Sequence, residues 1–185
     1  MATFKEQRVG IFIDVQNLYH SAKNLYNSRV NFAELIRQLS SGRKLIRAIA
    51  YVVRAEGVEE SSLPALPGRE AAFFEALRKS GLELRMKDIQ IYHGGVKKAD
   101  WDVGLAVDSI RMASGLDTII LVTGDGDFLP LIDYLRWGLG REVEVAAFSS
   151  SASGKLKESA DKVIAIEGLP RMLRKIKSKI DEVQN

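Results

Sequence analysis

The sequence predicts an α/β fold, a three-layer sandwich in which helices cover both faces of a mostly parallel central sheet. Three observations support this prediction. Apolar runs typical of buried strands alternate with segments whose apolar residues recur at helical spacing. Two of the runs, 8–14 and 119–122, are nearly all apolar, as expected for strands buried on both faces of a parallel sheet. Acidic residues follow both runs closely, at the edge where such sheets bind ligands.

Composition limits both the size of the fold and its chemistry. The chain has 185 residues, 46% of them hydrophobic, which predicts a single domain over 1–185 with one substantial core. Because there is no cysteine, disulfides, thiolate zinc sites and cysteine nucleophiles are excluded. Only two histidines are present, so a nitrogen-rich metal site is not expected. We therefore expect any metal to be bound by oxygen.

Charge and targeting signals indicate the compartment and the kind of partner. The N-terminal segment reaches Asp14 after a short apolar run, which does not match a secretory signal, and no apolar run approaches membrane-spanning length. This predicts a soluble cytoplasmic protein without a membrane partner. Lysine and arginine together exceed aspartate and glutamate by 27 to 24, a mild excess that is compatible with a polyanionic partner such as RNA.

The first strand, 8–14, ends at Asp14, and Asn17 follows one turn later. Asn17 lies near the start of a helix whose apolar face contains Leu18, Ala22 and Leu25. Helix capping is the simplest role for Asp14 or Asn17 taken alone. A second helix is expected after Asn31 as N-cap, because Glu34 completes a capping-box pattern three residues later.

Three further elements follow along the chain. Residues 45–53 are expected to form the second strand, with Arg54 at its exit. The segment 55–68 is rich in Glu, Ser, Pro and Gly, which predicts an exposed loop. A helix over 69–80 and a third strand over 82–92 come next, and the mixed pattern of this strand favours a place near a sheet edge.

A basic turn containing Lys97 and Lys98 leads into a helix that begins near Asp102. Since this helix follows a parallel strand, its first turn lies on the carboxyl edge of the sheet, where Asp100 or Asp102 can face Asp14. The predicted core face of this helix consists of Val103, Ala106, Val107 and Ile110. Asp108 lies about 240° around the helix from Asp102, so we assign Asp102 to the site and Asp108 to a supporting or solvent-facing position.

The strand 119–122 runs into a Gly-rich turn with two carboxylates, Asp125 and Asp127. Either residue alternatively only N-caps the helix that begins near Phe128. A fifth strand over 141–148, a short helix over 155–160 and a short strand over 163–166 complete the alternation. From about Leu169 the tail is expected to form a basic amphipathic helix with a solvated polar face.

If the first strand and the strand before Asp125 are neighbours, their ends lie about 5 Å apart. Four carboxylates then meet at one point: Asp14, Asp102, Asp125 and Asp127. They cannot all be ionised in a small cleft without a counter-charge, because like charges raise one another's pKa. A hard divalent cation, Mg²⁺ or Mn²⁺, resolves the conflict and activates water for attack on a phosphodiester.

Three segments together resemble the NYN domains, in particular their bacterial LabA-like branch within the PIN-like nuclease group. They are 12–17, 97–108 and 123–128. The resemblance implies a PIN-like sheet of Rossmann-like topology and an acidic metal site formed by Asp14, Asp102, Asp125 and Asp127. It also implies that Asn17 and Thr123 orient a ligand. Trp101 stands where the family usually has a small aliphatic residue.

The resemblance implies a metal-dependent ribonuclease with RNA as its partner. Basic groups beside the acids, Arg54, Lys97 and Lys98, are expected to contact the phosphate chain. One alternative is a PIN-like module that binds RNA or protein without cutting. A second is a phosphatase of the haloacid-dehalogenase type, whose last motif the turn at Asp125 resembles. This alternative is disfavoured because Asp14 is not followed two residues later by a second aspartate.

Overall fold

The computed structural model describes residues 5–54, 69–88, 90–91, 97–98 and 100–176. At its centre lies a six-stranded sheet of order β4-β3-β1-β7-β8-β9, in which every neighbouring pair is parallel. The strands are β1 (Arg8–Asp14), β3 (Lys44–Arg54), β4 (Glu83–Asp88), β7 (Thr118–Val122), β8 (Glu142–Ala147) and β9 (Lys162–Ala165). This arrangement confirms the predicted α/β fold with a parallel central sheet.

The order of the strands reverses at the middle of the sheet. The chain runs outward from β1 through β3 to β4, returns to β7 on the other side of β1, and continues to β8 and β9. As predicted, β1 and β7 are direct neighbours, with Ile13 opposite Val122. Both strands are buried because helices cover both faces of the sheet. The crevice beyond their carboxyl ends is therefore a topological switch point, where open α/β sheets bind ligands.

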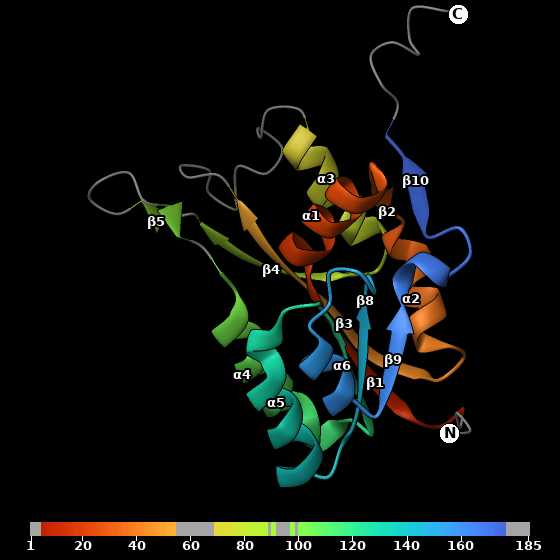
Figure 1. Ribbon diagram of the computed structural model, residues 1–185, viewed down its shortest axis with the longest axis vertical. Coiled ribbons are helices and arrows are strands. Elements are labelled where there is room, and N and C mark those ends of the chain that lie inside the picture. The colour runs from red at the N-terminus through yellow and green to blue at the C-terminus, as the bar shows by residue number, and fades with distance from the viewer. Residues whose placement is uncertain (1–4, 55–68, 89, 92–96, 99, 177–185) are drawn as a thin grey trace, which may run out of the picture.

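Two helical layers enclose the sheet (Figure 1). One face packs against α1 (Val15–Tyr26), α2 (Phe32–Ser40) and α3 (Arg69–Lys79). The other face packs against α4 (Asp102–Met112), α5 (Leu129–Asp133) and α6 (Gly154–Ser159). Strand residues alternate between the two cores, with Ile11 and Ile13 in the first and Phe12 in the second. The predicted sandwich of three layers is thus confirmed.

Two small antiparallel ladders complete the described chain. β2 (Ser28–Val30) pairs with β10 (Leu173–Lys175), and β5 (Gln90–Ile91) pairs with β6 (Lys97–Lys98). The strand expected over 82–92 is therefore divided, and its first part, β4, is an edge strand as its mixed pattern predicted. Within the described residues, no helix has both the length and the apolar character needed to span a membrane.

The core face predicted for α4 is wrong. The side chains that α4 buries completely are Leu105 and Ser109, whereas Val103 is 73% exposed and Val107 and Ile110 are also exposed. The helix is rotated because Trp101 packs against Gly104 at its start and the hydroxyl of Tyr51 binds Asp108 farther along. These contacts turn the polar face of α4, rather than its apolar stripe, toward β3.

One further local prediction is wrong, and another is confirmed only in part. In place of a helix from Leu169, the structure has β10, preceded by a turn in which Arg171 has a φ of +57°. Pro170 lacks an N–H for helical hydrogen bonding, and Met172 enters the core, so the segment extends along β2. Asn31 is the N-cap of α2, but its side chain makes no capping hydrogen bond. Glu34 instead accepts hydrogen bonds from Arg37 and Gln38.

Candidate active site

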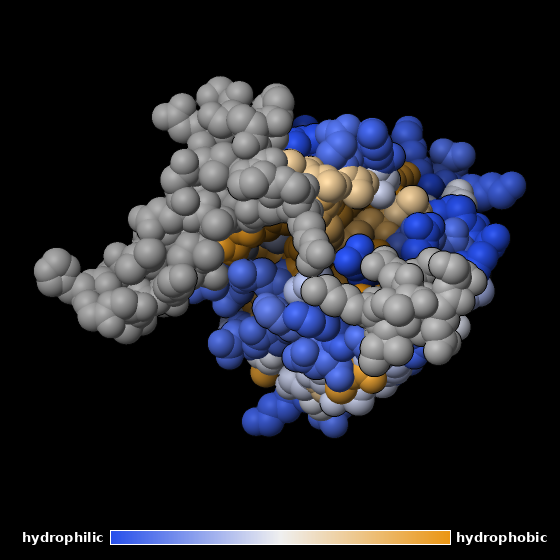
Figure 2. Space-filling view, turned by 90° about the horizontal axis from the view of Figure 1, so that it is seen from above, coloured by the Kyte–Doolittle hydropathy of each residue, from blue (hydrophilic) through white to orange (hydrophobic). Residues whose placement is uncertain are grey.

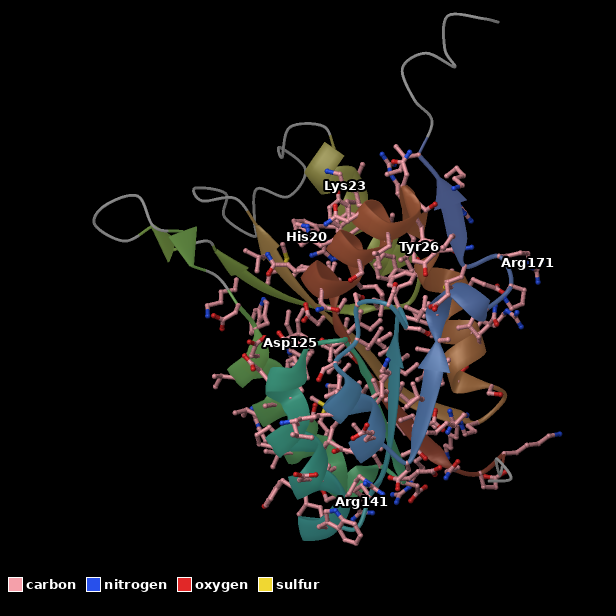
Figure 3. All side chains as sticks on the ribbon, viewed as in Figure 1. His20, Lys23, Tyr26, Asp125, Arg141 and Arg171 are labelled. Carbon is pink, nitrogen blue, oxygen red and sulfur yellow. The ribbon has the colours of Figure 1, made fainter. Side chains whose placement is uncertain are left out.

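The candidate site lies at the switch point, where β1 and β7 end side by side. Asp14 is the last residue of β1 and the N-cap of α1. Asp125 follows β7 and N-caps a 3-10 helix, Gly126–Phe128. Figure 3 labels Asp125 at this end of the sheet, while Arg141 marks the opposite end. Both carboxylates are therefore helix caps, and both also face the crevice where a ligand would bind.

Asp14 is held rigidly by hydrogen bonds to both of its oxygens. Oδ1 accepts the backbone N–H of Asn17 at 3.1 Å, and Oδ2 accepts the hydroxyl of Thr123 at 3.3 Å. Burial raises the pKa of Asp14, and the nearby charge of Asp125 raises it further, whereas the two hydrogen bonds lower it. The net pKa is raised, so the ionised form of Asp14 lacks sufficient counter-charge in its surroundings.

Thr123 and Asn17 shape the turn that carries Asp125. The Thr123 oxygen accepts the backbone N–H of Asp125 at 3.2 Å, and the Asn17 Oδ1 accepts the backbone N–H of Gly124 at 3.0 Å. Thr123 is only 1% exposed, so the ligand contact implied for it by the resemblance is not formed by an accessible hydroxyl. Thr123 instead positions two carboxylates. Asn17 lines the cleft itself.

Gly124 is required by the close approach of a neighbouring loop. A Cβ atom at this position would lie 3.1 Å from the Cα of Ala152, in the loop that follows β8. The same loop donates the N–H of Ser153 to the carbonyl oxygen of Gly124 at 2.9 Å. The glycine in the Thr-Gly-Asp motif therefore allows two carboxyl-edge loops to pack against each other, which fixes the direction in which Asp125 leaves the sheet.

Besides the end of β1 and the turn after β7, the start of α4 forms a third wall of the site. The Nε1 of Trp101 donates to the backbone oxygen of Val52 at 2.8 Å, at the carboxyl end of β3. The Trp101 ring also packs edge-on against Tyr51, with 5.5 Å between the ring centroids. Asp102 begins the helix directly after this anchor. Burial raises the pKa of Asp102, and the charges of Asp100, Asp14, Asp125 and Asp127 raise it further.

These walls enclose a cleft of about 200 Å³. Its lining residues are Asp14, Gln16, Asn17, Tyr51, Asp100, Trp101, Asp102 and Asp125. Three of the four carboxylates predicted from the sequence are thus brought together, with Asp100 as a further member. Asp127 is exposed outside the lining and uses its N–H to bind Asp125 at 2.9 Å. Its role as a ligand stays a prediction. Figure 2 views the molecule from this edge and shows hydrophobic residues in a hollow between hydrophilic surfaces.

Other residues singled out from the sequence lie elsewhere. Asp108 lies outside the cleft lining, where it accepts hydrogen bonds from the Tyr51 hydroxyl at 3.0 Å and from Arg85 Nε at 3.2 Å. Burial and the charge of Asp108 hold the pKa of Tyr51 far above its usual value, so its hydroxyl stays protonated. The side chains of Arg54, Lys97 and Lys98 lie outside the described part of the structure.

Sequence reasoning missed three residues that line the cleft. Gln16 and Trp101 lie inside the motifs used for the resemblance, but neither carries a charge that marks it as functional. Tyr51 lies within an apolar strand, and its hydroxyl becomes meaningful only beside Asp108. The position of Gln16 and Trp101 inside the motifs could have identified them. Tyr51 is identified only by the parallel pairing of β1 with β3, which places it opposite Asp14.

The donor set of the cleft fits a hard cation that retains water. Its lining combines four aspartates with the amide groups of Gln16 and Asn17 and contains no lysine or arginine. Among the residues that the structure describes, no three acidic, histidine or cysteine side chains approach closely enough to form a ready-made metal cluster. Mg²⁺ needs only one or two carboxylates because it keeps several waters, so an open acidic cleft suits it better than a closed cage would.

The comparisons with known proteins agree with this fold. The family model for the NYN domain matches residues 8–167. The Low amplitude and bright protein LabA of Synechococcus elongatus is 22% identical over 187 residues, covering 93% of this chain and 90% of that protein. A crystal structure of a Vibrio parahaemolyticus protein of unknown function has a TM-score of 0.79 at 27% identity, covering 94% of this chain and 100% of that one.

Proposed function

The chain belongs to the NYN domain family, and from that premise we propose that it is a metal-dependent ribonuclease. The membership and the likeness to LabA agree with the LabA-like branch that the three sequence motifs predicted. The proposed reaction is hydrolysis of RNA phosphodiester bonds in the acidic cleft, with Mg²⁺ or Mn²⁺ as cofactor.

One observation carries the proposal. Aspartates from three separate elements, the end of β1, the turn after β7 and the start of α4, line one small cleft at the switch point. Burial and mutual repulsion raise the pKa of both Asp14 and Asp102. A stable fold has no need to collect like charges in this way, so the arrangement favours a site that gains stability and function when a cation binds.

Each group in the cleft has a distinct proposed task. Asp14, Asp102 and Asp125 would hold the cation, which when bound supplies charge neutralisation at the phosphate and an activated water. Asp127 would support Asp125 through its backbone N–H and contribute negative charge at the rim. Thr123 keeps Asp14 and Asp125 in a fixed relation, because its hydroxyl bonds to both residues.

The polar and aromatic lining would orient the substrate. The amide nitrogen of Asn17 is placed to donate to a phosphate oxygen, since its Oδ1 is already engaged with Gly124. Tyr51 and Trp101 form an aromatic wall on which a base can stack, as single-stranded nucleic acids do on protein aromatics. Arg54, Lys97 and Lys98 remain the proposed contacts for the adjoining phosphate chain.

A specific observation also supports the binding-only alternative. The acids of the described structure do not form a closed cluster, as stated above, and an RNA- or protein-binding module would need none. The phosphatase alternative has less support, because the residues after Asp14 enter α1 directly and provide no second aspartate beside a nucleophile. Cleavage is therefore the property that separates the two remaining functions.

The test is a cleavage assay on single-stranded and structured RNA with Mg²⁺, with Mn²⁺ and with chelator. Asp125→Asn keeps the shape of the side chain but removes its charge, so we expect cleavage to be lost and the fold to be retained. Asp133→Asn is the matched control, because Asp133 is exposed on α5 and lies outside the cleft lining. Wild-type protein that binds RNA but cuts none of these substrates would replace the nuclease assignment with the binding module.

A further inference from the structure

A second and larger cleft lies on the α4 side of the sheet, toward the amino ends of the strands. Its volume is about 450 Å³, within the range of ligand sites. We call it the arginine groove, and it is lined by Ile46, Arg47, Arg85, Asp108, Arg111, Met112, Ser114, Gly115 and Leu116. The lining comes from β3, β4, the last turn of α4 and the segment before β7. The groove thus begins where the edge strand β4 leaves the sheet face open beside α4.

Cations dominate the groove. Arg85 Nε lies 3.2 Å from one oxygen of Asp108, and Arg111 Nη1 lies 3.9 Å from the other, so both guanidinium groups lie near the same carboxylate. Arg47 is 3.3 Å from Glu83. The three arginines thus face two carboxylates, which leaves an excess positive charge. All three side chains are at least 42% exposed, so their remaining N–H groups can reach a ligand.

The groove also has an apolar wall next to these cations. Ile46 is 42% exposed there, and Met112 and the almost fully buried Leu116 also line the groove. A guanidinium group binds phosphate oxygens with paired donors, while an apolar surface accepts a sugar or a base. The combination therefore suits a nucleotide unit better than it suits an isolated anion, which would not use the apolar wall.

The linings of the arginine groove and the acidic cleft are joined by one hydrogen bond. Tyr51 lines the acidic cleft, and its hydroxyl donates to Asp108, which lines the groove. Along β4, Lys87 follows Arg85 on the same face at a spacing of about 6.6 Å. The Nζ of Lys87 donates to the backbone oxygen of Asp100 and lies 5.9 Å from the centroid of the Trp101 ring. Lys87 thus places one cation between the groove and the acidic cleft.

We propose that the arginine groove binds the phosphate chain of single-stranded RNA whose neighbouring segment occupies the acidic cleft. This inference rests on the proposed function, because it takes the ligand of the acidic cleft to be RNA. Arg47 and Tyr51 are four positions apart on β3, about 13 Å along the strand, so the second contact lies away from the site of cleavage. The acidic cleft repels phosphates, and the groove supplies the compensating attraction at a distance.

The test compares RNA affinity for two double variants. Arg47→Ala with Arg111→Ala removes two exposed cations of the groove and leaves Arg85 paired with Asp108. Arg29→Ala with Arg174→Ala is the matched control, because these exposed arginines face each other across the β2–β10 ladder and removing them lowers the net charge equally. Figure 1 shows that ladder on the side of the molecule away from α4. All proteins carry Asp125→Asn so that binding is measured without cleavage.

Fluorescence anisotropy with an RNA of about 10 nucleotides and with a dinucleotide gives the readout. We expect the groove variant to bind the longer RNA about tenfold more weakly. Its salt slope should fall by about 1.4, or about 0.7 for each lost phosphate contact. Dinucleotide binding and the control should change little. Equal losses for both double variants would show only a net-charge effect and would overturn the proposal.

Three further results separate the possible outcomes. Calorimetry with inorganic phosphate tests for a free-anion site. If the groove variant loses phosphate binding but keeps its RNA affinity, the proposal is also overturned. Wild-type protein that cuts purified RNA while the groove variant binds RNA as tightly as the control would refute the groove alone. Wild-type protein that cuts nothing, with RNA binding that still depends on the groove, would refute the proposed nuclease and leave the groove in place.

Discussion

Replacement of Gly104 by alanine tests how the wall of the acidic cleft is built. A Cβ atom at this position would lie 2.5 Å from Cε3 and 2.8 Å from Cζ3 of Trp101, so the indole ring must move. Overpacking of this kind costs about 1–3 kcal/mol. Alanine also favours the helical state by about 1 kcal/mol relative to glycine. The net expectation for Gly104→Ala is therefore a destabilisation of about 1 kcal/mol.

The same substitution should change sign when the ring is absent. In a Trp101→Ala background the clash disappears and only the helix preference remains, so Gly104→Ala should stabilise the protein by about 1 kcal/mol. Urea denaturation of the wild type, both single variants and the double variant measures the coupling, which we expect to be about 2 kcal/mol. Additive free energies of unfolding would show that Trp101 and Gly104 do not depend on each other, and would refute this account of the cleft wall.

Two other predictions concern groups away from the cleft. Arg43 and Glu144 form a buried ion pair at 2.9 Å, with each side chain 1% exposed. Because Glu144→Ala leaves the charge of Arg43 unpaired, it should lower the free energy of unfolding by about 3–5 kcal/mol. A change below about 1 kcal/mol in urea titrations would contradict this. The Arg37 guanidinium lowers the pKa of Glu34 to about 2. A depressed carboxyl pKa stabilises the fold above the unfolded value of 4.5, so the advantage over Glu34→Gln should shrink as the pH falls from 4.5 to about 2. A stability difference that is constant with pH would argue against the ion pair.

Sequence patterns alone located the elements that have an apolar environment on both sides. The strands β1 and β7 bury residues 9–13 and 118–122, which are apolar apart from Gly10 and Thr118, so an apolar run alone locates both strands. Parallel strands place their carboxyl ends on one edge, so Asp14 and Asp125 could be assigned to one site before any contact was known. The edge position of β4 followed in the same way from its mixed pattern.

Tertiary contacts decided the features that depend on the orientation of a side chain. The rotation of α4 is set by Trp101 and by the Tyr51–Asp108 hydrogen bond, and it leaves Val103 exposed although Val103 belongs to the apolar stripe. Thr123 is buried next to Gly124, against which the loop at Ala152 packs. The groove of Arg47, Arg85 and Arg111 joins residues far apart in the chain, and a sequence pattern records spacing along one segment, not the packing that brings separate segments together.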